Sequence, residues 1–248
     1  DIDTVLITHY HRDQCASALV LKKAGVKICI PFSERKFYET PDLIRSNPDI
    51  YDDYTCFNPN FCILEDITPD GYAKDYQTIN WHGIDFKAIP LPGHTPGSVG
   101  YLFTINGQKI LACGDTICSS GKLEKYHFTQ WKYMTFQGHY HQLESLKAIQ
   151  KINPDILLTG HGNVLTNPAQ AITALIEKLE KTWQMFFNEP VKYFQPQFDQ
   201  ITAHLWQVLN SGPNTYILTN DTGTATIIDN GFMSVSSLEI SGDRKSVV

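Results

Sequence analysis

Two features that would assign the class of protein at once are missing from this sequence. No apolar run approaches the roughly eighteen residues that a membrane-spanning helix requires. No positively charged stretch followed by an apolar one opens the chain, as a secretory signal would. We therefore expect a soluble protein without a membrane partner. The chain begins with aspartate rather than methionine, so its compartment stays open, with the cytoplasm favoured.

An excess of positive charge is missing too. Lysine and arginine total 20 against 26 acidic residues, which gives a formal net charge of -6. Proteins that bind nucleic acids usually present a basic surface to the phosphates, so we expect no nucleic-acid partner. The hydrophobic content of 42% over 248 residues is enough for a substantial core in one large or two small domains.

Cysteine pairs with metal-binding spacing are also absent. The six cysteines form no Cys-x-x-Cys pair, which argues against a zinc ribbon. Cys29 and Cys113 lie in apolar runs and are expected to be small core residues. Cys56 and Cys62 flank a five-residue segment and could form a disulfide in an oxidising compartment, or both could be free thiols. The sequence leaves both states open.

What the sequence does contain is a group of potential metal ligands directly after an apolar strand. Residues 5–7 are predicted to form a buried strand, and His9, His11 and Asp13 follow it. Alternate residues of an extended chain point the same way, so these three side chains can converge on a cation. The alternative interpretation is a polar loop with two surface histidines.

Three later segments repeat the pattern of an apolar strand, a small residue and then one histidine or aspartate. His94 lies in a Pro-Gly-His-Thr-Pro-Gly turn, Asp115 follows an Ile-Leu-Ala run, and His161 follows an Ile-Leu-Leu run. Glycine and proline fix the backbone of such turns and leave the imidazole aimed. Four strand ends of this kind, in this order, indicate one shared metal centre.

In these residues and in their order the chain resembles the metallo-β-lactamase superfamily, and within it the glyoxalase-II-like branch, over about residues 4–187. The family pattern is a His-x-His-x-Asp-His loop followed by single His, Asp and His ligands. The resemblance implies that three histidines hold a first metal ion, that two residues hold a second, and that one aspartate bridges both ions. These residues are His9, His11 and His94 for the first ion, Asp13 and His161 for the second, and Asp115 for the bridge.

Gln14 departs from the family pattern, because it stands where the family has a further histidine. Zinc and iron prefer imidazole to a neutral amide. We therefore expect Gln14 to be a weak ligand, or a hydrogen-bonding residue beside the centre, and the second ion to be bound less firmly.

The ligand set implies hydrolytic chemistry. A divalent ion lowers the pKa of bound water to about 7, so hydroxide can attack an ester, thioester, lactone or amide carbonyl of a small-molecule substrate. Asp115 would hold the nucleophile in place. Asp13, a ligand if the second metal is present, could otherwise accept a proton from the water. The expected cofactor is one or two zinc ions, with iron or manganese as alternatives. A mononuclear iron enzyme of the sulfur dioxygenase type, which Gln14 favours, and a non-catalytic metal-stabilised binding module are the other interpretations. The oligomeric state stays open.

The resemblance also implies a fold of the α/β class, a four-layer αββα sandwich of two mixed sheets with the metals at one edge. The alternation of strands and amphipathic helices agrees with such layers. His139 and His141 are expected to be exposed at the start of a helix. The predicted helices cover residues 15–24, 142–152 and 168–187, and the predicted strands cover residues 26–30, 78–89 and 100–112, with a hairpin turn at Asn106-Gly107.

Two segments lack regular periodicity and are rich in aromatic residues. Residues 31–75 are predicted to be an insertion in the metal-binding core (residues 1–187) that covers the substrate, with a plain packing excursion as the alternative. Residues 122–137 follow Asp115 and form either a pocket wall or a satellite hydrophobic cluster.

Residues 201–231 resemble the strands that ordinarily open this fold, yet here they come last. A circular permutation, a joining of pieces of a longer protein and a partial second copy without ligands would each explain this order. We predict a single domain over residues 1–248 in which these strands complete the first sheet, since the termini of compact domains often lie close together.

Overall fold

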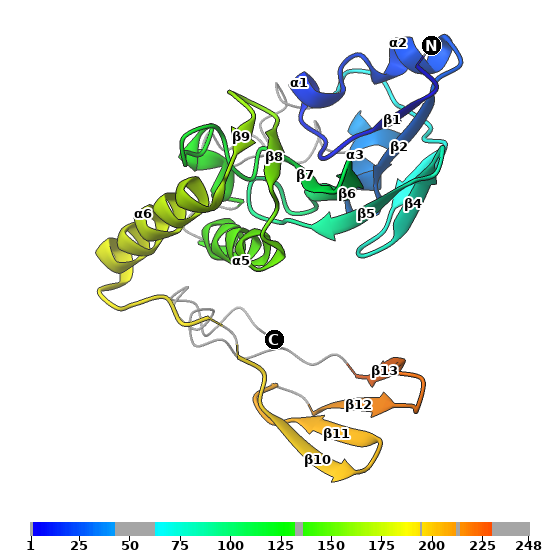
Figure 1. Ribbon diagram of the computed structural model, residues 1–248. Helices are drawn as coiled ribbons and strands as arrows, with labels where there is room; N and C mark the ends of the chain where they lie inside the picture. Colours follow the sequence, from blue (N-terminus) through cyan, green and yellow to red (C-terminus); the bar gives the residue numbers. More distant parts are fainter. Residues whose placement is uncertain (1, 43–62, 132–135, 194, 212–213, 230–248) are drawn as a thin grey trace. The chain divides into compact units, whose positions relative to one another are not determined.

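The computed structural model describes residues 2–42, 63–131, 136–193, 195–211 and 214–229 (Figure 1). The chain divides into two compact units, Asp1–Thr182 and Trp183–Val248, called unit 1 and unit 2 below. None of the described helices has the length and apolar character required to span a membrane.

A three-stranded parallel sheet opens unit 1. Its order is β1-β2-β3, formed by β1 (Thr4–Leu6), β2 (Lys27–Pro31) and β3 (Gly71–Ala73). Parallel neighbours require a crossover connection, which two short helices supply between β1 and β2. These are α1 (Arg12–Cys15) and α2 (Ala18–Lys23), where one helix had been predicted over residues 15–24. The buried Cys15 and Ala18 of these helices share one hydrophobic cluster with Ile28 and Ile30 of β2.

A six-stranded mixed sheet follows in unit 1, in the order β4-β5-β6-β7-β8-β9. The turn between β6 and β7 lies at Asn106 and Gly107, which have φ angles of 53° and 77°. Two positive φ angles are what a two-residue hairpin of type I′ requires, so the predicted turn is confirmed. The strands are β4 (Thr78–Trp81), β5 (Ile84–Pro90), β6 (Val99–Ile105), β7 (Gln108–Gly114), β8 (Ile156–Thr159) and β9 (Leu165–Thr166).

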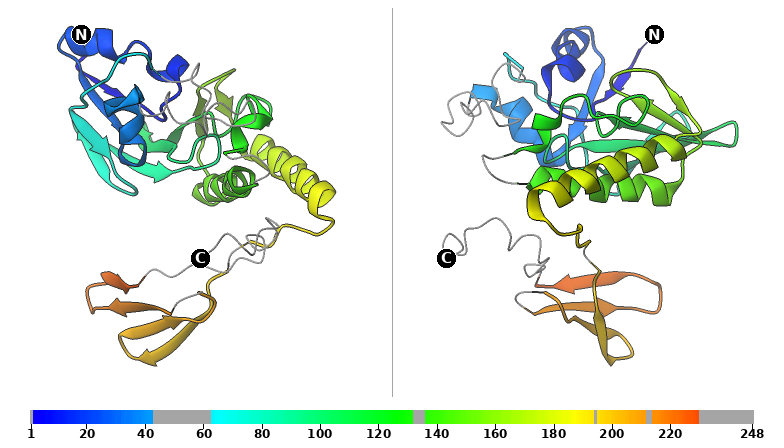
Figure 2. Two further views of the ribbon diagram at one scale, coloured as in Figure 1. Left: turned by 180° about the vertical axis from the view of Figure 1, so that it is seen from behind. Right: turned by 90° about the vertical axis from the view of Figure 1, so that its left-hand side faces the viewer.

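Two long helices lie side by side next to this sheet (Figure 2): α5 (Gln137–Ile152) and α6 (Ala169–Phe187). Leu143, Leu146 and Ile149 of α5 are fully buried, at the spacing of a single helix face. The helix predicted over residues 168–187 is confirmed. Shorter elements connect the layers: η1 (Phe32–Glu34), α3 (Arg35–Glu39) and η4 (Tyr126–Thr129).

The exposure predicted for His139 and His141 is wrong. Helix α5 begins at Gln137, five residues earlier than predicted, so both histidines lie inside its first turns. His139 is 1% exposed, because it shares the apolar face with Leu143 and Leu146. Its ring nitrogens lie 2.8 Å from Tyr126 Oη and 3.0 Å from the Leu179 carbonyl oxygen. These bonds satisfy a buried histidine without a metal.

An irregular insertion had been predicted over residues 31–75. The two ends of this range that the structure describes contain regular elements, namely η1, α3 and β3. Residues 43–62, with Cys56 and Cys62, lie outside the described residues, so the substrate cover and the disulfide remain predictions. Cys29 and Cys113 are buried, as predicted.

Unit 2 contains a four-stranded antiparallel sheet in the order β10-β11-β12-β13. In the structure these strands pair with one another. That residues 201–231 complete the first sheet stays a prediction. Pairing between consecutive strands closes only short loops, which costs little chain entropy. A single domain over residues 1–248 and a permuted order stay predictions. The strands are β10 (Phe198–Thr202), β11 (Leu205–Val208), β12 (Thr215–Thr219) and β13 (Ala225–Ile228).

Candidate metal centre

The first ligand segment of unit 1 is fixed by hydrogen bonds from both sheets. After β1 ends, Ile7 N–H donates to the Cys29 carbonyl of β2 (2.9 Å). From the six-stranded sheet, Tyr101 Oη donates to the Ile7 carbonyl (2.7 Å) and Val99 N–H to the Thr8 carbonyl (2.9 Å). The next residue, His9, therefore lies where the two sheets meet.

Thr8 orients the imidazole of His9. Its Oγ1 lies 3.1 Å from His9 Nδ1, which leaves Nε2 for the centre. Gly114 makes room for this contact: it has a φ of +53°, and a Cβ added there would lie 2.7 Å from Thr8 Oγ1. A side chain at position 114 would therefore disturb the histidine through Thr8.

Three buried histidines form a first cluster: His9, His11 and His94, which are 0%, 2% and 3% exposed. His11 Nδ1 lies 2.9 Å from His94 Nε2. The Nε2 atoms of His9 and His94 lie 3.5 Å and 3.4 Å from Asp115 Oδ2. Since a zinc ion sits about 2.0–2.1 Å from each histidine nitrogen, ligands of one ion lie within about 4 Å of each other. The distance of 2.9 Å between His11 Nδ1 and His94 Nε2 is within this limit.

The chemistry of the first cluster fits a cation. Among the described residues, buried His9 Nε2 has no hydrogen-bond partner, which is costly unless another group uses its lone pair. Burial, with smaller contributions from neighbouring histidines, holds the pKa values of His9 and His94 well below their usual range. Neutral imidazoles are the form that binds a metal ion.

A second cluster consists of Asp13, Asp115 and His161. His161 Nε2 lies 3.1 Å from Asp13 Oδ2, and its Nδ1 lies 2.9 Å from Asp115 Oδ1. Asp115 thus presents Oδ1 to this cluster and Oδ2 to the histidine cluster. Asp13 is exposed and His161 is partly exposed, so this half of the centre is open to solvent.

The electrostatics of the second cluster follow from burial and pairing. Burial raises the pKa of Asp115, although the hydrogen bond from His161 opposes this effect. For His161, partial burial alone would lower the pKa, but the hydrogen bond to Asp115 and the charges of Asp115 and Asp13 outweigh burial and raise it. The two groups therefore form a coupled acid and base pair.

The structure brings together all six residues predicted as ligands, and Gln14 lies beside them. A Cβ added at Gly160 would overlap Asp115 Oδ1 and come within 3.0 Å of Gln14 Nε2. One premise of the prediction was wrong: Asp13 does not continue an extended chain but lies in the first turn of α1. This turn directs Asp13 to the second cluster. Metal ligation by the six residues stays a prediction.

Of two residues beside the centre, one lies in a segment for which the sequence left two interpretations open, and the other was not recognised in the sequence. Phe128 lies in the segment that was interpreted as either a pocket wall or a satellite cluster. Its ring centroid is 4.8 Å from the ring centroids of both His11 and His94. Gln142, on the buried face of α5, donates from Nε2 to the Thr116 carbonyl (2.6 Å). A polar residue among the leucines of that face was the available signal for Gln142.

Glu34 was also missed. Its side chain is fully buried. Burial raises the pKa of its carboxyl to about 7, although hydrogen bonds from Thr95, Tyr10 and Gly97 oppose this shift. Position 34 falls in a segment whose sequence gives no periodic pattern, so nothing there indicated a contact with the centre.

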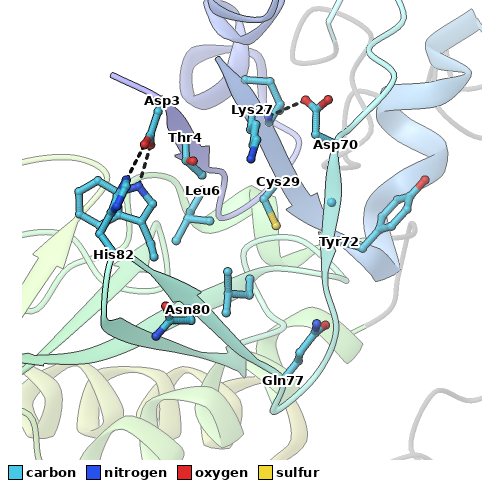
Figure 3. Close-up of a pocket in the computed structure, with 14 residues that line it drawn as sticks. Asp3, Thr4, Leu6, Lys27, Cys29, Asp70, Tyr72, Gln77, Asn80 and His82 are labelled. Atoms are coloured by element: carbon cyan, nitrogen blue, oxygen red, sulfur yellow. Dashed lines mark hydrogen bonds and ion pairs between the residues drawn. The ribbon is translucent and has the colours of Figure 1, made fainter. Parts of the chain in front are cut away.

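A pocket of about 450 Å³ lies elsewhere in unit 1, between β1 to β3 and the start of the six-stranded sheet (Figure 3). None of the seven predicted site residues lines it. On one side, Asp3 accepts hydrogen bonds from Trp81 Nε1 and pairs with His82 Nε2, each at 2.7 Å. The pocket is therefore separate from the metal centre.

Comparisons with known proteins agree on the family. Residues 1–161, more than half of the chain, match the family described as the metallo-beta-lactamase superfamily. The uncharacterized protein YobT of Bacillus subtilis is 27% identical over 183 residues, which cover 71% of this chain and 74% of that protein. The hydroxyacylglutathione hydrolase GloC of Haemophilus influenzae is 26% identical over 170 residues, which cover 67% and 71%. The metallo-beta-lactamase family protein TTHA1429 of Thermus thermophilus has a TM-score of 0.56 at 16% identity, over 76% of this chain and 64% of that chain.

The similarity to TTHA1429 confirms the predicted fold class, a mixed α/β structure of the metallo-β-lactamase type. For two other curated relatives, the matched region spans only 35% and 58% of the relative's own length. The family match over residues 1–161 carries the assignment independently of these lengths. The chain belongs to the metallo-β-lactamase superfamily.

Proposed function

We propose that the chain is a metal-dependent hydrolase that uses two metal ions, zinc in the first instance, to cleave a small ester, thioester, lactone or amide. The observation that carries this proposal is the position of Asp115, whose two carboxylate oxygens face two separate clusters of ligand-type side chains. A relative named hydroxyacylglutathione hydrolase supports an acyl compound as the substrate.

Each residue of the centre has a role under this proposal. His9, His11 and His94 would hold one ion through neutral imidazoles. A divalent ion bound there would polarise a carbonyl oxygen and lower the pKa of a water molecule to about 7. Asp115 and His161 orient each other through the 2.9 Å bond between Oδ1 and Nδ1.

Asp13 would be a ligand of the second ion when that ion is bound, and would supply a route for protons when the second position is empty. Its Oδ2 lies 3.1 Å from His161 Nε2, and the side chain is exposed. Asp13 can therefore accept a proton at Oδ2 and release it to solvent, as general bases do.

A mononuclear iron enzyme of the sulfur dioxygenase type is the second candidate. The difference between the clusters favours it: the three histidines are buried, whereas Asp13 is exposed and Gln14 offers an amide where an imidazole would bind better. Under this candidate only the histidine cluster would hold an ion.

Metal analysis of the purified protein separates these candidates. Close to two zinc ions per chain, with turnover of a panel of thioesters, lactones and β-lactams, would support the hydrolase. A single iron, with oxygen uptake on persulfide substrates, would replace it by the oxygenase. Bound metal without any turnover would leave the binding-module interpretation.

The matched variants are His94→Ala and His82→Ala. His94 belongs to the buried cluster, whereas His82 pairs with Asp3 away from the centre. We expect His94→Ala to lose metal and activity and His82→Ala to keep both. If His94→Ala kept its full metal content, the assignment of the first cluster would be wrong.

A further inference from the structure

A carboxylate outside the metal centre joins the two segments that carry the buried histidines. Glu34, in η1, is 0% exposed. Its Oε2 accepts a hydrogen bond from Tyr10 N–H (2.7 Å). Its Oε1 accepts one from Gly97 N–H (3.1 Å) and another from the Thr95 hydroxyl. One side chain thus spans segments that are more than eighty residues apart in the chain.

The positions of these donors connect Glu34 to the histidines. Tyr10 lies between His9 and His11, and Thr95 directly follows His94. The contact of 2.9 Å between His11 Nδ1 and His94 Nε2 joins the same two segments. The relative placement of these nitrogens therefore depends on whatever holds the segments together.

The surroundings leave Glu34 little freedom. A Cβ added at Gly97 would lie 2.5 Å from Glu34 Cγ, so the close approach requires glycine at this position. On the other side, the ring of Tyr10 stacks on Phe37 of α3, with centroids 4.1 Å apart. The segment η1–α3 thus holds Tyr10 by both its backbone and its side chain.

The hydroxyl network fixes the direction of each bond. Thr95 has one hydroxyl hydrogen, which it donates to Glu34, so the contact of 2.6 Å between Thr95 Oγ1 and Ser98 Oγ is donated by Ser98. In the ionised form of Glu34, both carboxylate oxygens act as acceptors in these bonds. An amide cannot replace them, because its NH₂ group would face a backbone N–H on one segment or the other.

We propose that Glu34 is a positioning residue, which holds the loops of His9, His11 and His94 in register for metal binding without touching the ion. This inference rests on the proposed metal centre. Hydrogen-bond partners outside the ligand shell typically change metal affinity by about 10- to 100-fold when they are removed.

The test compares Glu34→Gln with Glu39→Gln. Glu39 lies on the neighbouring α3, is not fully buried, and accepts a hydrogen bond from Tyr72 Oη (2.5 Å), away from the histidines. Zinc affinity is measured by competition with a chelator, and the unfolding midpoint is measured with and without zinc. We expect Glu34→Gln to weaken zinc binding by about 10- to 100-fold and to reduce the rise in midpoint that zinc produces. Glu39→Gln should change neither.

Two further variants keep the test decisive if Glu34→Gln does not fold. Thr95→Val removes one donor to Glu34 and should weaken zinc binding. Thr95→Ser retains the hydroxyl and should bind zinc as tightly as the unsubstituted protein. A purely structural role would lower the midpoints with and without zinc equally and leave the chelator competition unchanged, which would overturn the inference. If the unsubstituted protein bound neither zinc nor iron, the metal centre itself would be overturned, and the inference with it.

Discussion

The substitution Asp115→Asn separates the stability of the fold from the stability that bound metal adds. Asp115 is 3% exposed, and its two oxygens lie 2.9 Å from His161 Nδ1 and 3.4 Å from His94 Nε2. Asparagine has nearly the same shape but no charge, so it can fill the space without bridging two cations. We expect the metal count to fall from two ions to one.

The size of the effect follows from linkage. An ion present at about 100 times its dissociation constant stabilises the folded state by about 2.7 kcal/mol. In a unit of this size, 1 kcal/mol shifts the unfolding midpoint by about 2–4 °C. Losing one of two ions should therefore lower the midpoint of the zinc-loaded protein by about 5–11 °C.

The metal-free protein should respond differently. Burial raises the folded-state pKa of Asp115, so its ionised form is disfavoured in the folded protein without metal. A group whose pKa is raised on folding costs stability as the pH rises through the folded-state value. Asparagine has no such cost, so at pH 7 the metal-free midpoint should stay the same or rise.

Calorimetry with and without zinc, together with metal analysis, checks this prediction. Asp85→Asn is the matched control, because Asp85 is exposed and accepts a hydrogen bond from Asn80 outside the centre. If Asp115→Asn lowered the metal-free and zinc-loaded midpoints equally, or still bound two zinc ions, the bridging role would be refuted.

Three other changes test the centre and the fold. Gln14→His should raise occupancy of the second ion in a metal titration; unchanged stoichiometry would show that position 14 does not limit it. Because the pKa values of His9 and His94 are held below the usual 6.5, their protonation should release zinc only below that pH, as a zinc-sensitive dye would report; release at higher pH would contradict this. Gly107→Ala, at a φ of +77°, should destabilise unit 1 by about 1 kcal/mol in urea, whereas Gly71→Ala should have little effect.

The sequence predicted the ligand positions because each follows an apolar strand and carries a residue type with distinct chemistry. Strand ends at Leu6, Gly114 and Thr159 are local features that a hydrophobic pattern reveals. The ligands converge because these strands, from two sheets, end where the sheets meet. The direction of Asp13 was not predicted, because a four-residue helix has too few positions to show a period.

The contacts that hold the ligands in place could not be predicted in this way. Glu34 accepts hydrogen bonds from Tyr10 and Gly97, which are 24 and 63 residues away in the sequence. A local hydrophobic pattern cannot indicate contacts over such separations. His139 illustrates the same limit, since burial on α5 depends on the preceding turn beginning at Gln137. Sequence order predicted the candidate metal ligands, whereas the contacts of Glu34 and His139 come from tertiary packing.

Two buried carboxylates, Asp115 in the centre and Glu34 outside it, have different roles. Asp115 faces the two clusters of ligand-type side chains, and without a cation its charge is opposed only in part by its contact with His161. Glu34 faces three donors from the chain itself, so its hydrogen bonds persist without metal. Because Glu34 holds the histidine loops before any ion arrives, the first cluster does not have to be ordered by the metal. This preorganisation explains why the buried cluster, and not the exposed pair of Asp13 and His161, should bind the first ion.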